Sequence, residues 1–168
     1  SNNHFDTTRA NILDIEANPV DLVCEESFDF ESKEPFKGNI NIKKLEDFIN
    51  EKGPSNIPII MLTITNNTGG GQPVSMQNIK ETSNIAKKYN IPFYIDACRF
   101  AENAYFIKMN EKEYINIEII DIVKEMFSYA DGCTMSAKKD AIANIGGFLC
   151  TNDDELAKKK KDLLILTE

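Results

Sequence analysis

The 168-residue sequence predicts an α/β fold, a three-layer α/β/α arrangement around a mainly parallel sheet. Short apolar runs alternate with amphipathic helical stretches along the chain, which is the pattern of repeated strand–helix–strand units. The apolar runs are nearly continuous, as expected of parallel strands that are buried on both faces. No linker rich in Pro, Gly or Ser divides the sequence, so residues 1–168 are expected to form a single domain.

Hydrophobic periodicity and turn residues place the elements in order. Runs rich in apolar and β-branched residues predict strands at 20–24, 57–64, 92–95, 131–135 and 145–150. Apolar residues at helical spacing predict helices at 39–52, 76–89, 99–108 and 117–130, and a last helix that begins after 151–154 and continues to Glu168. Asn41 and Ser75 are suitable N-caps, and Gly53 and Asn90 are suitable helix ends.

Composition excludes several classes of function. The net charge of −8 argues against nucleic acid as a partner, because phosphate binding needs a basic surface. No apolar run reaches the roughly 18 residues of a membrane span, and no signal peptide is visible. The four cysteines are scattered without metal-ligand spacing, which favours free thiols in a reducing cytoplasm. One histidine, His4, is a poor basis for a zinc site.

The stretch 134–140, Thr-Met-Ser-Ala-Lys-Lys-Asp, carries two adjacent lysines after a short apolar run. Burial lowers the pKa of a lysine, and its neutral amine forms Schiff bases with carbonyl cofactors such as pyridoxal phosphate. The alternative interpretation is a solvated turn, since exposed lysines are the rule.

Asn67, Asp96 and the lysine stretch each follow a predicted strand directly. Ligands bind beyond the carboxyl ends of strands in open α/β sheets, so these residues are expected to converge there. Asp96 could hold a pyridinium nitrogen or cap the next helix, and Arg99 could reach an anionic oxygen or lie at the surface. The glycines at 69–71 allow close approach to a ligand or form a flexible turn, but they lack dinucleotide or P-loop spacing.

Three stretches together resemble one known family. They are Thr65–Ser75 (TNNTGGGQPVS), Tyr94–Tyr105 (YIDACRFAENAY) and Thr134–Asp140 (TMSAKKD). Their order, spacing and length resemble the β-eliminating lyases, the family of tryptophanase and tyrosine phenol-lyase, over nearly the whole chain. The resemblance implies part of the large cofactor-binding domain of the aspartate aminotransferase-like fold, fold type I of the enzymes that use pyridoxal 5'-phosphate (PLP).

The resemblance also implies roles for individual residues around the PLP ring. Lys139 matches the lysine that forms the Schiff base, and it is the candidate for Cα proton transfer. Asp96 matches the partner of the pyridine nitrogen. Asn67 and Arg99 match the pair that hydrogen-bonds the phenolic oxygen, and Phe5 matches the aromatic residue that stacks on the ring.

Further matches lie at the edges of the expected site. Ser136 and Lys138 match positions at the cofactor phosphate. Asn144 matches a position whose backbone carbonyl helps to bind a potassium ion. Asp6 matches a catalytic aspartate of the substrate pocket.

The implied reaction is an α,β-elimination of a small aromatic amino acid. Asp6 follows Phe5 as in tryptophanases, where phenol-lyases have threonine, whereas Gly132-Cys133-Thr134 looks more like a phenol-lyase. We therefore expect cleavage of L-tryptophan to indole, pyruvate and ammonia, with L-tyrosine cleavage to phenol as the alternative. The parent protein is expected to be a cytoplasmic homotetramer.

The chain is expected to be a fragment of its parent. It begins without methionine, and the resemblance implies that the N-terminal segment and the C-terminal small domain of the family are expected to be absent from it. We therefore expect no useful turnover from these 168 residues by themselves. A non-catalytic fragment is the alternative hypothesis, and another lyase, aldolase or transferase with the same cofactor fold is a further one.

Overall fold

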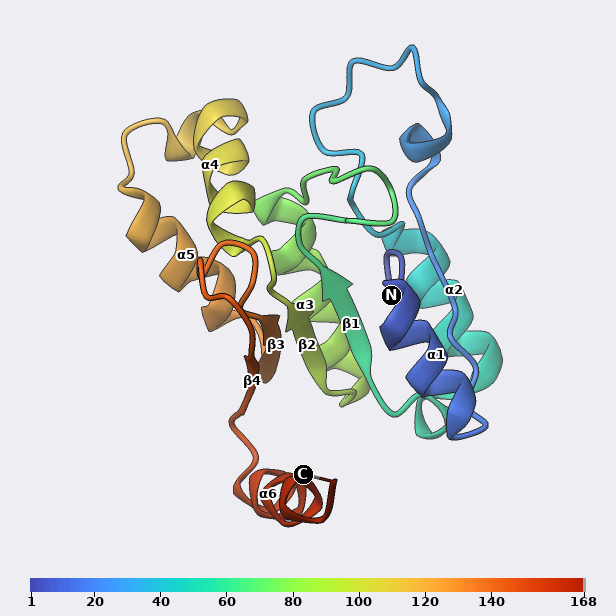
Figure 1. The fold of residues 1–168 in the computed structure, drawn as a ribbon. Coiled ribbons are helices and arrows are strands. Elements are labelled where there is room, and N and C mark those ends of the chain that lie inside the picture. Colours follow the sequence, from blue (N-terminus) through green and yellow to red (C-terminus); the bar gives the residue numbers. More distant parts are fainter. Residues whose placement is uncertain (168) are drawn as a thin grey trace.

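The structure is a computed structural model that describes residues 1–167, and in this part of the chain a four-stranded mixed sheet lies at the centre (Figure 1). The strands are β1 (Ile60–Thr63), β2 (Phe93–Asp96), β3 (Gly132–Ser136) and β4 (Gly147–Thr151). They lie in the order β1-β2-β3-β4, with β1, β2 and β3 parallel and β4 antiparallel to β3. The predicted α/β fold with a mainly parallel sheet is confirmed.

Helices connect and flank the strands. The α-helices are α1 (Asp6–Asp14), α2 (Ile42–Lys52), α3 (Met76–Tyr89), α4 (Phe100–Asn110), α5 (Ile119–Ser128) and α6 (Asp154–Thr167), and the short 3-10 helices are η1 (Glu25–Phe28), η2 (Pro54–Asn56) and η3 (Lys112–Tyr114). The predicted caps form as expected: the side chain of Asn41 accepts from Lys44 N, and that of Ser75 accepts from Asn78 N. Figure 1 shows α6 apart from the other helices, attached through β4. The predicted end of this helix at Glu168 lies outside the described residues.

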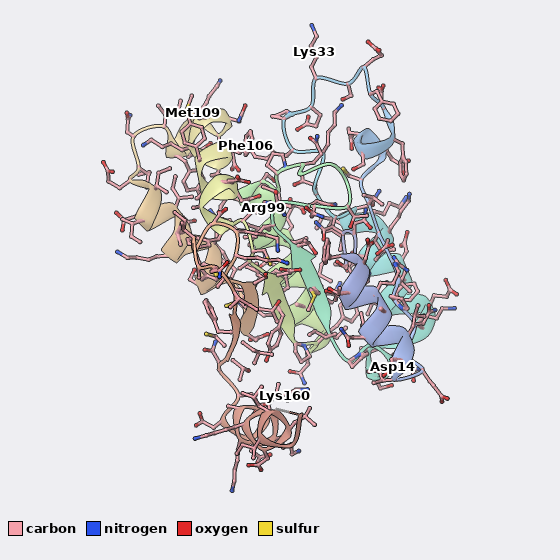
Figure 2. All side chains as sticks on the ribbon, viewed as in Figure 1. Asp14, Lys33, Arg99, Phe106, Met109 and Lys160 are labelled. Atoms are coloured by element: carbon pink, nitrogen blue, oxygen red, sulfur yellow. The ribbon has the colours of Figure 1, made fainter. Side chains whose placement is uncertain are left out.

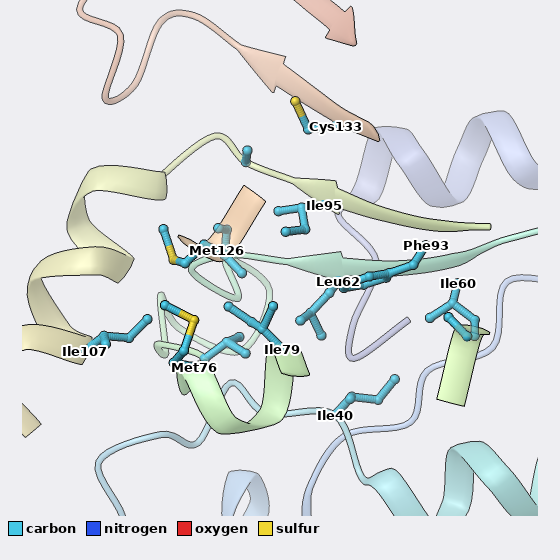
Figure 3. Packing of buried hydrophobic residues seen from close by; sticks show 14 of the residues in the cluster. Ile40, Ile60, Leu62, Met76, Ile79, Phe93, Ile95, Ile107, Met126 and Cys133 are labelled. Atoms are coloured by element: carbon cyan, nitrogen blue, oxygen red, sulfur yellow. The ribbon is translucent and has the colours of Figure 1, made fainter. Parts of the chain in front are cut away.

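One face of the sheet holds the hydrophobic core. Leu62 of β1 and Ile95 of β2 are paired in register and fully buried, so both side chains lie on the same face. Ile79 of α3 and Met126 of α5 are also fully buried in this cluster, and Figure 3 shows their side chains beneath the strands. The alternation of side chains in a strand sends the neighbours of Leu62 and Ile95 to the opposite face.

That opposite face is polar at the carboxyl ends of the strands. Thr63, Asp96 and Thr134 are aligned across β1, β2 and β3. The N-terminal segment closes the outer edge of β1, because the side chain of Asn2 donates to Thr63 O (3.0 Å) and accepts from Thr63 N (2.9 Å). The Asn2 side chain thus satisfies the backbone of Thr63 much as a neighbouring strand would. The polar face of the sheet is left open for a ligand.

Three parts of the fold differ from the prediction. The predicted strand at 20–24 is wrong, because Val23 makes an isolated bridge to Ile40 and the structure assigns no strand there. Helix α1 was not predicted; it has no buried residue, so it leaves no apolar periodicity in the sequence. Strand β4 departs from the parallel pattern because a short loop returns it directly beside β3. No helix among residues 1–167 is long and apolar enough to cross a membrane.

Candidate functional site

A cavity of about 530 Å³ opens at the carboxyl ends of β1, β2 and β3. Its wall comes from the segments 5–8, 63–67, 96–99 and 134–139 and from Phe148 of β4. It contains all seven residues that the sequence analysis assigned to the cofactor, namely Phe5, Asn67, Asp96, Arg99, Ser136, Lys138 and Lys139. The expected convergence at this edge of the sheet is therefore observed.

Asp96 forms the floor of this cavity as the last residue of β2. Its side chain is buried, with 8% of its surface exposed. Among residues 1–167 its hydrogen-bond partner is the thiol of Cys98, which donates to Oδ1 over 3.0 Å, and no salt bridge includes this carboxylate. A buried carboxylate without a cation is costly, so this position is suited to a positively charged or protonated ligand group.

Cys98 links the carboxylate to the lysine stretch. Besides its bond to Asp96, its sulfur accepts a hydrogen bond from Ser136 N over 3.3 Å. Burial raises the pKa of the Cys98 thiol, and its hydrogen bond to Asp96 raises it further. The thiol therefore stays protonated at neutral pH and remains a donor to the carboxylate.

The loop after β1 presents Asn67 to the cavity. The buried side chain of Asn66 accepts from Gly69 N (3.0 Å), and Asn66 O accepts from Gly71 N (2.9 Å). Gly70 and Gly71 have φ of 87° and 76°, which L-residues with side chains rarely adopt. The three glycines thus form a fixed turn with internal hydrogen bonds, and Asn67 lies half-buried at its start.

The lysine loop connects β3 with β4 and is anchored at several points. Ala137 N donates to Gly146 O over 2.9 Å, and Ala143 N donates to Ala137 O over 2.9 Å. Within this loop Lys138 is exposed, whereas Lys139 is half-buried.

Lys139 extends across the cavity toward the N-terminal segment. Its Nζ lies 5.9 Å from the centroid of the Phe5 ring, within cation–π distance. Phe5 is half-buried and precedes α1, whose Thr7 and Thr8 complete that wall. An amine and an aromatic face are therefore brought together from opposite ends of the chain.

Arg99 also lines the cavity, and it directly precedes the first residue of α4 (Figure 2). Its backbone N–H donates to Ile64 O over 3.2 Å, which ties it to the end of β1. Its guanidinium is half-buried, with Nε 3.9 Å from Glu102 Oε2. This weak ion pair leaves most of the five guanidinium donors available for an anionic ligand oxygen.

The residues fit a PLP group on two observations. The buried carboxylate of Asp96 has no cation partner among the described residues, and it suits a protonated pyridine nitrogen. The hydroxyl of Thr65, which lines the cavity, is buried and has no hydrogen-bond partner within residues 1–167. A buried polar atom of this kind needs an explanation, and a polar ligand supplies one.

Two assigned residues lie elsewhere. Asp6 is exposed in the first turn of α1; its neighbours Phe5 and Thr7 line the cavity, but Asp6 does not. Asn144 is exposed in the lysine loop and also lies outside the cavity lining. In residues 1–167 no group of three or more His, Cys, Asp or Glu could hold a metal ion. A potassium site at the Asn144 carbonyl stays a prediction.

Sequence reasoning assigned no role at this site to Thr65, Cys98 or Asp140. Thr65 and Cys98 line the cavity, and Asp140 hydrogen-bonds to α4 from the lysine loop. Cys98 has a signal in hindsight, because it follows Asp96 by two residues at a strand end. Nothing in the local sequence indicates that Asp140 contacts a helix that begins 40 residues earlier, since 140 − 100 = 40.

Comparison with known proteins places the chain among lyases. The family model described as Beta-eliminating lyase matches residues 1–165. A tryptophanase of Salinibacter ruber is 55% identical over 168 residues, which are 100% of this chain and 36% of that protein. A tyrosine phenol-lyase of Pasteurella multocida is 50% identical over 167 residues, 99% of this chain and 36% of that protein. The chain thus spans a little over a third of the length of these relatives.

Proposed function

Because this chain belongs to the beta-eliminating lyase family, we propose that it builds the PLP site of a lyase that eliminates the side chain of an aromatic amino acid. The observation that carries the proposal is the single cavity in which a buried carboxylate, Asp96, faces the lysine loop. The α/β fold with a mainly parallel sheet agrees with fold type I of this family.

Each side of the cavity would hold a different part of the cofactor. Lys139 would bind it covalently, and Asp96 would accept a hydrogen bond from the pyridine nitrogen and keep it protonated. Arg99 and Asn67 would donate to its phenolic oxygen. Ser136 and Lys138 would hold the phosphate, and the Phe5 ring would pack on the cofactor ring.

The cofactor, when bound, supplies an electron sink for the pair of electrons left on Cα. The chain supplies proton handling and positioning. The Lys139 amine, once free, is the base that takes the Cα proton, because it is the half-buried amine in the cavity. The buried Asp96 holds a fixed negative charge beneath it, supported by the thiol of Cys98. The apolar face of Phe5 excludes water from one side.

For the whole protein we propose L-tryptophan as substrate, with indole, pyruvate and ammonia as products. Support comes from the Asp6 that follows Phe5 and from the tryptophanase at 55% identity. The phenol-lyase at 50% identity and the Gly132–Thr134 stretch favour L-tyrosine and phenol as the second candidate. Release of indole from tryptophan, compared with phenol from tyrosine by the full-length protein, decides between them.

Trapping tests the cofactor site directly. The purified chain is incubated with PLP, reduced with borohydride, and mapped by peptide mass spectrometry. We expect a dominant adduct on Lys139 that disappears in Lys139→Ala and persists in Lys138→Ala, the matched control on the adjacent residue. Labelling spread over exposed lysines such as those of α6, or an adduct that survives Lys139→Ala, would refute the assignment.

The assembly and location of the whole protein remain proposals as well. We propose that the full-length protein is a homotetramer and is cytoplasmic. Light scattering on the full-length protein tests the tetramer, and a monomer in solution at working concentration would contradict it.

A further inference from the structure

Cys133 and Cys150 lie directly opposite each other on β3 and β4. Two residues before Cys133 in this ladder, Asn152 N donates to Asp131 O over 2.8 Å, which marks a hydrogen-bonded pair. Hydrogen-bonded pairs recur at every second position of an antiparallel ladder, with Cα atoms about 5.5 Å apart. Disulfides span Cα separations of about 4.4–6.8 Å, so the Cα spacing of this pair falls within the range that a disulfide can bridge.

The two thiols share one face of the sheet but differ in their surroundings. Both line an apolar hollow of about 530 Å³ beside Phe100 and Phe127. This hollow differs from the cofactor cavity, although Met135 and Phe148 line both. Cys133 is buried and Cys150 is exposed, and both are free thiols. Burial, together with the proximity of Cys150, raises the pKa of Cys133 to about 11. An oxidant in solution therefore meets Cys150 first, with Cys133 behind it as a neighbouring thiol.

We propose that Cys133 and Cys150 form an oxidisable dithiol site, which hydrogen peroxide converts into a cross-strand disulfide. The Cys150 thiolate attacks one peroxide oxygen; an S–O bond forms, the O–O bond breaks, and hydroxide leaves, which gives a sulfenic acid. The Cys133 sulfur then attacks the Cys150 sulfur; the S–S bond forms, the S–O bond breaks, and water leaves with the thiol proton. Overall two thiols are oxidised by two electrons, and one peroxide is reduced to two waters.

The position of this disulfide gives it a structural consequence. Cys133 and Cys150 lie on the two strands that flank the loop with Lys138 and Lys139, so the bond joins these strands three positions from the Ser136–Gly147 pair at the base of that loop. Four of the five residues of β4 are exposed. Joining β4 to β3 covalently is expected to slow amide hydrogen exchange in β4 several-fold. The cross-link holds the two strands together, so local opening of the hairpin becomes rarer.

Peptide mapping of the purified protein tests the site. The protein is treated with hydrogen peroxide, its remaining thiols are blocked with N-ethylmaleimide under denaturing conditions, and it is digested without reduction. We expect a linked peptide pair that contains Cys133 and Cys150, and two maleimides fewer per chain than in untreated protein. The matched control, Cys24→Ser, removes a buried thiol elsewhere and should leave the linked pair unchanged.

Single variants test the order of the steps. In Cys133→Ser, the Cys150 sulfenic acid has no neighbouring thiol, so we expect dimedone to label Cys150 far more than in the wild-type protein. Wild-type peptide maps settle the matter even if a variant folds poorly. Chains cross-linked to each other through Cys150, a linkage to Cys98, or a doubly alkylated Cys133 and Cys150 after peroxide would each overturn the proposal. Because no cofactor is added, its failure would leave the PLP site untouched.

Discussion

Asp140 caps a helix to which it does not belong. Its Oδ2 accepts hydrogen bonds from the backbone N–H groups of Ala101 (2.7 Å) and Glu102 (3.0 Å). These are the second and third residues of α4, and the residue at the N-cap position, Arg99, makes no side-chain cap bond. Asp140 therefore joins the lysine loop to the helix that follows Asp96, and both halves of the cavity depend on this contact.

The substitution Asp140→Ala should lower the free energy of unfolding by about 2 kcal/mol. Loss of an N-cap side chain costs about 0.5–2 kcal/mol, and loss of a negative charge at a helix N-terminus costs about 0.3–1 kcal/mol more. The carboxylate is half-buried, which places the sum near the middle of that range. Asp140→Asn keeps one acceptor oxygen and loses the charge, so its cost should be about 1 kcal/mol.

Equilibrium unfolding in urea measures these differences, with m compared between variants to confirm a common transition. A matched control is Asp153→Ala. Asp153 Oδ1 accepts from Leu156 N over 2.9 Å and caps α6 in the same way. Helix α6 packs chiefly against β4 and stands apart from the core, so loss of this cap should fray α6 and change the unfolding energy by less than about 0.5 kcal/mol.

A second readout separates capping from positioning. Below the unfolding transition, Asp140→Ala should reduce the PLP adduct trapped on Lys139, because the loop is no longer tied to α4. If Asp140→Ala is as stable as the wild-type protein, or no less stable than Asp153→Ala, the capping argument is refuted. If it is destabilised but traps Lys139 normally, Asp140 supports the helix alone.

Three further predictions follow from local contacts. Burial raises the pKa of Glu111, so the folded state binds this proton more tightly than the unfolded chain does. Stability therefore falls as pH rises from the usual pKa of 4.5 through the raised pKa. Glu111→Gln should flatten this pH dependence of the urea midpoint, and an unchanged slope would contradict the prediction. Burial and, after it, the hydrogen bond to Asp96 raise the pKa of Cys98, so Asp96→Asn should remove the second cause and speed alkylation of Cys98 by iodoacetamide several-fold. An equal or slower rate would argue against the contact. A Cβ at Gly132 would lie 2.3 Å from the Tyr94 ring. Gly132→Ala should therefore lower the free energy of unfolding, measured in urea, by about 1–3 kcal/mol. A neutral effect would mean that the ring is not packed there.

The sequence predicted the elements whose burial leaves a periodic pattern. The strands β1 and β2 and the helices α2 and α3 have fully buried apolar side chains, and their caps at Asn41 and Ser75 form as their chemistry predicts. Helix α1 was not predicted, because all its residues remain at least partly exposed. The antiparallel direction of β4 was not predicted either, since an apolar run indicates burial and says nothing about strand direction.

The residues of the site also fall into those that the sequence predicted and those that it did not. The sequence placed Asn67, Asp96 and Lys139 at strand ends, and parallel pairing brings such positions to one edge of the sheet. Two other contacts join segments about 40 residues apart: Cys98 with Ser136, which are 38 residues apart, and Asp140 with Ala101, which are 39 residues apart. Such contacts follow from the three-dimensional course of a loop, and no local pattern encodes them.

The polar face of the sheet makes the fold depend on its ligand. Asp96 is buried without a cation, and the Thr65 hydroxyl is buried without a partner in the described chain. A buried polar group left unsatisfied costs about 1–3 kcal/mol, which the apolar face of the sheet must offset. A ligand that satisfies these groups binds the folded state alone, and at 100 times its dissociation constant it adds about 2.7 kcal/mol to the free energy of unfolding. The groups that weaken the free protein are thus the ones that would bind the cofactor, so replacing Asp96 should raise the stability of the free protein and lower its affinity for the cofactor.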